Sequence, residues 1–86
     1  MTKSELDKFL KDIGYKYKYN DKDEIYGYNT NNFTITVRGK HIIAITVLYY
    51  YNAISHFIPL KNLTIEKFNV IVETLKEKII ELNKIL

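Results

Sequence analysis

The 86-residue sequence has no cysteine and no tryptophan, a single proline and only three glycines. Without cysteine, the fold can have neither disulfide bonds nor thiolate metal sites. The glycines at positions 14, 27 and 39 are isolated, so they form no glycine-rich phosphate loop. No apolar run approaches the roughly 20 residues of a membrane-spanning helix, and the charged N-terminal residues are unlike a signal peptide. These absences predict a cytoplasmic protein that uses no cofactor and contacts no membrane.

The composition is typical of one small globular domain. Hydrophobic residues make up 47% and charged residues 27% of the chain, proportions that disordered proteins do not show. A chain of this length cannot build two separate cores, so we predict a single domain over residues 1–86. Lysine, isoleucine, asparagine and tyrosine, whose codons are AT-rich, dominate the sequence, which indicates an origin in a low-GC bacterium or in its phages or mobile elements.

Residues 3–13 are predicted to form a short amphipathic helix. Thr2 and Glu5 fit a capping box at its N-terminus. Gly14 stands where a left-handed C-terminal cap is expected. One face of the helix carries the apolar residues at helical spacing, namely Leu6, Phe9, Leu10 and Ile13.

Between residues 15 and 60 the pattern changes to the period of two that is typical of strands. We predict strands at 15–19, 24–29, 33–38, 41–51 and 54–58. The Gly39–Lys40 pair is predicted to close a tight hairpin. Residues 41–51 are apolar on both faces, which predicts a central strand covered on both sides for part of its length. Pro59 cannot donate a ladder hydrogen bond, so we expect it at a strand end or an edge.

A second, longer helix is predicted from Thr64, its N-cap, to the end of the chain. Leu63 and Phe68 fit a hydrophobic staple. Apolar residues recur at alternating spacings of three and four, and they form a stripe wide enough to pack on a sheet. The predicted fold is therefore α+β: an antiparallel four- to five-stranded β-meander flanked by an N-terminal and a longer C-terminal helix. As an alternative, the stripe predicts a homodimer whose seam consists of Leu75, Ile79, Leu82 and Leu86.

The sequence contains no constellation that is typical of an enzyme. His41 and His56 are the only histidines, and we interpret both as ordinary residues of the sheet. Ser55 and His56 are adjacent in a predicted strand, so their side chains point to opposite faces and cannot form a nucleophile–base pair. Asp21, Asp23 and Glu24 crowd one turn but lack the spacing of a calcium loop. We therefore expect neither catalysis nor a metal site.

The net charge of +3 resides entirely in the predicted sheet, because the acids and bases of each helix balance. All eight tyrosines lie in the same region. Tyrosines among cations suit a protein interface, or the stacking of nucleic-acid bases. The predicted partner-binding face of the sheet consists of Lys16, Lys18, Arg38, Lys40, Tyr26 and Tyr28.

The leading hypothesis is a small non-enzymatic module that binds a host protein or nucleoprotein, with inhibition of that partner as one possible outcome. In size and composition the chain is similar to small proteins of phages and mobile elements that act in this way, anti-CRISPR inhibitors among them. A single-stranded nucleic-acid-binding protein with a Tyr/Lys sheet face is one alternative. A structural homodimer is another.

Overall fold

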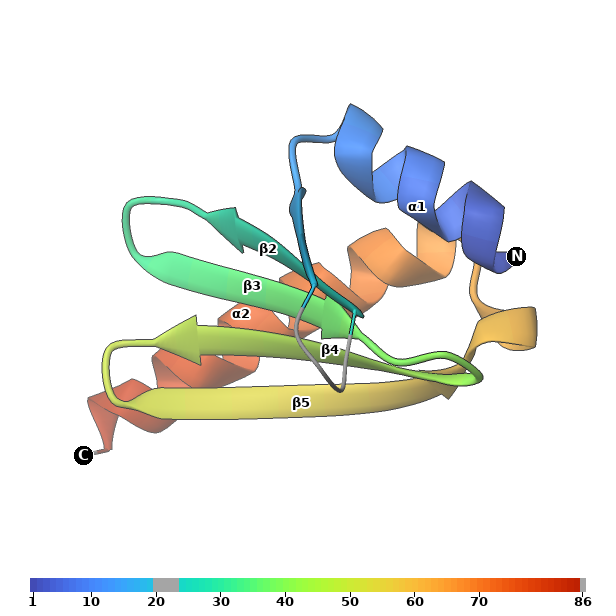
Figure 1. Cartoon of the computed structure of the whole chain (residues 1–86). Helices are drawn as coiled ribbons and strands as arrows, with labels where there is room; N and C mark the ends of the chain where they lie inside the picture. Colours follow the sequence, from blue (N-terminus) through green and yellow to red (C-terminus); the bar gives the residue numbers. More distant parts are fainter. Residues whose placement is uncertain (20–23, 86) are drawn as a thin grey trace.

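The fold consists of one five-stranded antiparallel sheet and two main helices (Figure 1). The computed structural model describes residues 1–19 and 24–85. The strands follow one another across the sheet in the order β1-β2-β3-β4-β5, which is a meander. The α+β meander predicted from the sequence is thereby confirmed. The elements are α1 (Lys3–Asp12), β1 (Lys16–Tyr19), β2 (Glu24–Asn29), β3 (Phe33–Arg38), β4 (Ile42–Tyr49), β5 (Asn52–Pro59), the short 3-10 helix η1 (Leu60–Asn62) and α2 (Ile65–Lys84).

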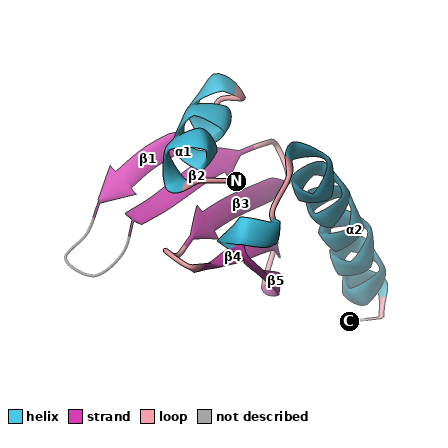
Figure 2. Ribbon diagram, turned by 90° about the vertical axis from the view of Figure 1, so that its right-hand side faces the viewer, coloured by secondary structure: helices cyan, strands magenta, loops and turns pink. Residues whose placement is uncertain are grey.

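Both helices cover the same face of the sheet. In Figure 1, α2 passes behind the strands, and Figure 2 shows α1 and α2 on one side of them. The helices also contact each other, because the ring of Phe9 in α1 meets the ring of Phe68 in α2 edge-on, with the ring centroids 5.2 Å apart. Aromatic pairs favour this geometry. The opposite face of the sheet is left without a covering layer among the described residues.

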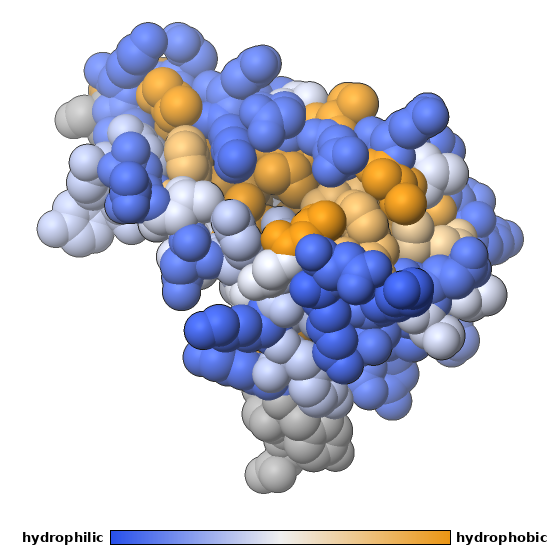
Figure 3. All heavy atoms as spheres, turned by 90° about the horizontal axis from the view of Figure 1, so that it is seen from above, coloured by the Kyte–Doolittle hydropathy of each residue, from blue (hydrophilic) through white to orange (hydrophobic). Residues whose placement is uncertain are grey.

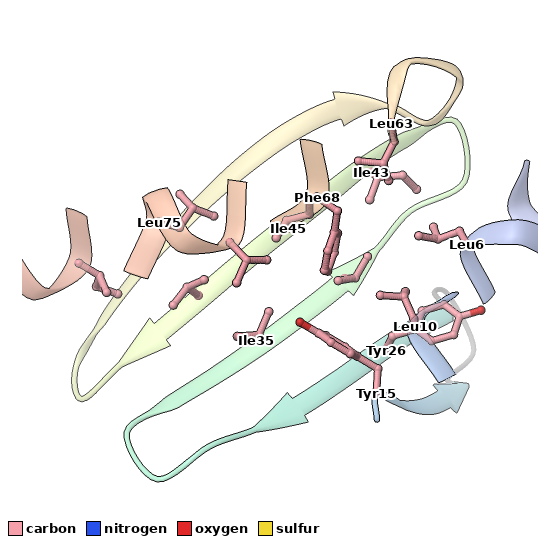
Figure 4. Packing of buried hydrophobic residues seen from close by; sticks show 14 residues of the cluster. Leu6, Leu10, Tyr15, Tyr26, Ile35, Ile43, Ile45, Leu63, Phe68 and Leu75 are labelled. Carbon is pink, nitrogen blue, oxygen red and sulfur yellow. The ribbon is translucent and has the colours of Figure 1, made fainter. Parts of the chain in front are cut away.

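A single hydrophobic core lies between the helices and the sheet (Figure 4). The strands contribute alternate residues, as the period of two requires. Full burial of such a side chain contributes about 1.5–3 kcal/mol to stability. The core residues are Leu6 and Leu10 of α1, Tyr15, Tyr26, Ile35, Val37, Ile43, Ile45 and Val47 of the sheet region, Leu63, and Phe68, Val72, Leu75 and Ile79 of α2.

The helix ends agree with the local signals in the sequence. The Thr2 amide donates to Glu5 Oε1 at 2.8 Å, and the Glu5 amide donates to Thr2 Oγ1 at 3.2 Å. At the other helix, the Lys67 amide donates to Thr64 Oγ1 at 3.1 Å. Gly14 follows α1 with a φ of +100°, a conformation that glycine adopts without a steric penalty. The predicted capping box and both predicted N-caps are thus confirmed.

The turn between β4 and β5 differs from the prediction. β4 ends at Tyr49 and β5 begins at Asn52, so the turn consists of Tyr50 and Tyr51. Tyr50 has a φ of +53°, which is rare for a residue with a bulky side chain. The sequence carries no turn residue here, and the prediction therefore extended one strand to Tyr51 and started the next only at residue 54. The favourable free energy of pairing β4 with β5 along their full length outweighs the low preference of Tyr50 and Tyr51 for a turn.

Two further predictions about β4 are wrong. This strand is covered on one side only, and Ile42 and Leu48 on its other side are 52% and 38% exposed. The reason is that both helices pack on the same face of the sheet. The hairpin before β4 is also wider than predicted, because Arg38 pairs with Ala44. Gly39 has a φ of +123° within this loop.

Candidate functional site

The strand register defines which residues share a face of the sheet. Directly paired residues point to the same side. One row across the sheet runs through Tyr17, Tyr26, Val37, Ile45 and His56, and its central members are buried beneath the helices. We call the opposite side the open face. It carries Lys16, Lys18, Ile25, Gly27, Asn29, Thr34, Thr36, Arg38, Ile42, Ala44, Thr46, Leu48, Ala53, Ser55, Phe57 and Pro59.

One end of the open face is cationic. Lys16, Lys18 and Arg38 are all exposed there. The ion pairs among the described residues use lysines of α1 and α2 and none of these three cations. No aspartate or glutamate in the described part of the sheet lies on the open face, and Glu24 points to the helix side, where it pairs with Lys3 at 3.2 Å. Within residues 1–19 and 24–85, no acidic side chain therefore compensates the positive charge at this end of the face.

The other end of the open face is apolar. Phe57 in β5 is 66% exposed, and it lies in the same row as Ala44 and Arg38. Adjacent strands are about 5 Å apart, so Phe57 and Arg38 are separated by about 10 Å across β4. Ile42 and Leu48 extend the apolar surface along β4. Apolar side chains gathered on an uncovered face are typical of a protein-contact surface.

A hydroxyl pair lies at the centre of the apolar end. Thr46 Oγ1 and Ser55 Oγ are 2.7 Å apart, which joins β4 to β5 on the open face. Thr36 occupies the next position of the same row, and Lys16 ends it at the β1 edge, with Gly27 between them. A row of hydroxyl groups therefore runs from the apolar end of the face toward its cationic end.

The structure places three of the six predicted binding residues on the open face. Lys16, Lys18 and Arg38 lie together on the open face, as predicted. Lys40 is exposed in the loop after β3, where the register does not assign it to a face. The prediction for Tyr26 and Tyr28 is wrong, because both lie on the helix-covered side.

Both tyrosines are used to build the fold. Tyr26 is 2% exposed and its hydroxyl donates to Asp7 Oδ1 at 2.6 Å. Tyr28 stacks on Tyr15 with the ring centroids 5.1 Å apart. Among the strand tyrosines whose side chains the structure describes, none shares the open face with the cations. A Tyr/Lys face for stacking nucleic-acid bases is therefore not present in this part of the chain.

The predicted dimer seam along α2 is wrong for two of its four members. Leu75 and Ile79 are 5% and 0% exposed because they pack against the sheet within one chain. Leu82 is 38% exposed, and Leu86 lies outside the described residues. The apolar stripe of α2 therefore packs mainly into the core of the same chain.

Figure 3 shows that hydrophobic residues on the side of the molecule that carries α1 form a band bordered by hydrophilic ones.

The histidines and acids of the described part of the chain do not gather into a metal-binding cluster. His41 and His56 are both exposed. Ser55 and His56 point to opposite faces of β5, as predicted. Asp21 and Asp23 lie outside the described residues. No group of three or more histidine, cysteine, aspartate or glutamate side chains within residues 1–19 and 24–85 is placed to hold a metal ion.

Sequence reasoning missed the apolar end of the open face. It did not single out Phe57 or Ile42, because alternation alone does not say which face of β5 meets the helices. The only signal was the clustering of apolar residues on both faces of 41–51.

Comparison with protein-family models, with curated proteins and with solved structures gave no match to the chain. Within the residues that the structure describes, no helix is both long and apolar enough to cross a membrane.

Proposed function

We propose that this protein is a non-enzymatic interaction module that binds another protein through the open face. The observation that carries the proposal is the combination, on one uncovered sheet face, of an apolar patch around Phe57 with three cations that form no ion pair with another described residue. Interfaces combine an apolar centre with polar and charged surroundings in this way. Tyrosine is absent from the described strands of this face, which favours a protein over single-stranded nucleic acid as the partner.

The partner expected from this chemistry has an acidic surface beside an apolar patch. Lys16, Lys18 and Arg38 would meet carboxylates, and Phe57 would enter a hydrophobic pocket. Complementary charge chiefly sets the association rate and the choice of partner, whereas a buried aromatic anchor contributes most of the affinity. With its small size and its many residues of the types that AT-rich codons encode, the module fits a phage or mobile-element protein that blocks a host protein in the cytoplasm.

The test compares two triple variants of equal net charge. In the face variant, Lys16, Lys18 and Arg38 are replaced by Glu. In the control variant, the replacements are at Lys61, Lys67 and Lys78, which are exposed outside the strands. Tagged wild-type protein is used to capture a partner from a low-GC bacterial lysate, and the purified partner is then titrated with each variant. Exposed charge changes alter stability little, and circular dichroism checks the fold of each variant.

We expect the control variant to bind the partner as wild type does and the face variant to lose binding. A Phe57→Ser variant should also weaken binding by at least about tenfold, a change of about 1.4 kcal/mol. If the face variant binds as well as wild type, the open face is not the binding surface. A single-stranded oligonucleotide is titrated in parallel at several salt concentrations. Tight binding that falls steeply with salt would instead identify a nucleic-acid-binding protein.

A further inference from the structure

The two edge strands of the sheet differ in their protection against pairing with another strand. β1 is short, with four residues, and it carries Lys16 and Lys18. β5 has eight residues, no lysine, arginine, aspartate or glutamate, and no glycine. Short length and charged side chains are the means by which proteins keep sheet edges from pairing. By these criteria the β1 edge is protected and the β5 edge is not.

The outward-facing backbone groups of β5 follow from the hairpin geometry. Tyr49 and Asn52 flank a two-residue turn, so they form a hydrogen-bonded pair, and every second pair along the ladder is of the same type. The Leu60 amide, which donates to the His41 carbonyl at 2.8 Å, continues this alternation. The even-numbered residues of β5 therefore bond to β4, and the N–H groups of Ala53, Ser55 and Phe57 point away from the sheet.

These outward groups have no hydrogen-bond partner among the described residues. Ala53, Ser55 and Phe57 are exposed residues, and their outward backbone groups together offer a template for a further antiparallel strand. The template ends at Pro59, which has no N–H. A further strand can therefore form ladder hydrogen bonds only with the stretch from Ala53 to Phe57.

We propose that the β5 edge pairs with the β5 edge of a second copy of this chain, in an antiparallel dimer with its twofold axis at Ser55. In this register Ser55 lies opposite Ser55 of the other copy, and Phe57 lies opposite Ala53. All outward N–H groups of the stretch then find carbonyl partners. A large side chain lies beside a small one on the open face, and Pro59 falls beyond the ladder. The proposal does not depend on the proposed function: the dimer pairs through the backbone edge of β5, and the proposed function uses side chains of the open face, although Phe57 belongs to both.

A second feature makes the chain complementary to itself. A shallow groove of about 490 Å³, lined by His56, Ile58, Val70 and Ile71 among others, lies beside the end of β5 and the first turns of α2. Figure 1 shows that α2 crosses the sheet obliquely and that its C-terminal end lies near the start of β5. The groove lies toward the opposite end of both elements, between the end of β5 and the first turns of α2.

The last turns of α2 carry the apolar residues that can fill this groove. Asn52 Nδ2 donates to Asn83 Oδ1 at 3.1 Å, which holds the end of α2 beside the start of β5. Leu82 is 38% exposed and Ile85 is 80% exposed. In an antiparallel β5 pair, the start of one strand lies next to the end of the other. The C-terminal end of each α2 therefore lies next to the groove of the other copy. The β5 edge and the groove are thus both complementary to a second copy of this chain.

The first experiment measures the mass of the wild-type protein by light scattering and sedimentation over a dilution series from high micromolar to nanomolar. A concentration-dependent dimer is expected, and a monomer at every concentration would overturn the proposal. Ser55→Lys and Ser55→Glu place like charges opposite each other at the twofold axis. Each variant alone should self-associate on the order of tenfold more weakly, whereas an equal mixture should form a heterodimer. Ser55 is exposed, so the monomer fold should tolerate both changes.

Cysteine substitution provides a matched control, because the chain has no cysteine of its own. Under mild oxidation Ser55→Cys should form a covalent dimer across the twofold axis. Thr46→Cys should not, although Thr46 is the direct neighbour of Ser55 on the same face, because it lies one strand farther from the axis. Equal cross-linking of both variants, or a charge mixture that stays monomeric, would refute pairing through β5. A dimer lost only in a Leu82→Ser, Ile85→Ser variant would place the interface on α2 alone.

Discussion

The hydroxyl of Tyr26 in β2 donates a 2.6 Å hydrogen bond to Asp7 Oδ1 in α1. This bond connects the first helix to the sheet and satisfies the one polar atom of a side chain that is otherwise buried. Leaving that hydroxyl unpaired would cost about 1–3 kcal/mol. The bond from Tyr26, together with the nearby Lys11, holds the pKa of the Asp7 carboxyl below its usual range. Burial, reinforced by the bond to Asp7, raises the pKa of Tyr26.

The Tyr26–Asp7 pair predicts a loss of stability at both ends of the pH range. The lowered pKa of Asp7 contributes stability above its unfolded value of about 4, and this contribution is lost as the pH falls. The raised pKa of Tyr26 contributes stability below about pH 10, and it is lost as the pH rises further. In urea melts over a pH series, Asp7→Asn should flatten the acid limb and Tyr26→Phe the alkaline limb. If Asp12→Asn, on the exposed side of the same helix, flattened the acid limb equally, the assignment would be wrong.

Replacing Leu75 with alanine should reduce the free energy of unfolding by about 2–5 kcal/mol. Leu75 lies in the middle of α2 and is 5% exposed within the core, so its truncation leaves a cavity. Chemical denaturation measures the loss. Ile65→Ala, at a position of the same helix that is half exposed, serves as the control and should cost less than about 1 kcal/mol. A similarly small loss at Leu75 would show that the helix packs through another face.

Gly39→Ala should destabilise the protein by at least about 2 kcal/mol, whereas Gly27→Ala should change stability by less than about 1 kcal/mol. Gly39 has a φ of +123°, and a Cβ atom there would overlap the carbonyl oxygen of Ile42. At Gly27 a Cβ atom would meet nothing within 4 Å, since this residue faces the open side of the sheet. Thermal and urea melts of the two variants measure the difference. Equal effects would contradict the loop conformation.

Thr64→Ala should cost about 1 kcal/mol of stability, and Thr64→Ser should stay close to wild type. The Thr64 hydroxyl accepts the Lys67 amide at the start of α2, and serine keeps the oxygen that alanine removes. Urea melts of both variants test the expectation. The cap would have no energetic role if alanine and serine gave the same stability.

The helices and most strands could be predicted because their signals are local. Thr2, Glu5 and Gly14 mark the ends of α1 through bonds and dihedral angles within a few residues. Alternation within β3 placed Arg38 on the side away from Ile35 and Val37, and the structure agrees. Each of these features depends on neighbours in the chain, which the sequence displays directly.

The faces of β2 could not be predicted in the same way. Ile25 alternates with Tyr26, so either residue could have faced the core. The pairing of Tyr26 with Tyr17 and Val37 places Tyr26, and not Ile25, on the face that meets the helices. A shift of one residue would have buried Ile25 and exposed both Tyr26 and Tyr28. The binding-site prediction failed at these two tyrosines because register is a relation between strands and is not visible within one of them.

By itself the sequence determined a single α+β meander, the ends of its helices and the alternation of its strands, since periodicity and caps act within one or two turns of chain. Only the tertiary structure decided that Tyr26 is buried, that Leu75 and Ile79 serve the core, and that Phe57 joins Arg38 on the open face. These outcomes depend on strand register and on both helices docking to one side. Such choices are made by contacts between residues far apart in the chain, and they minimise the free energy of the whole core rather than of any one element.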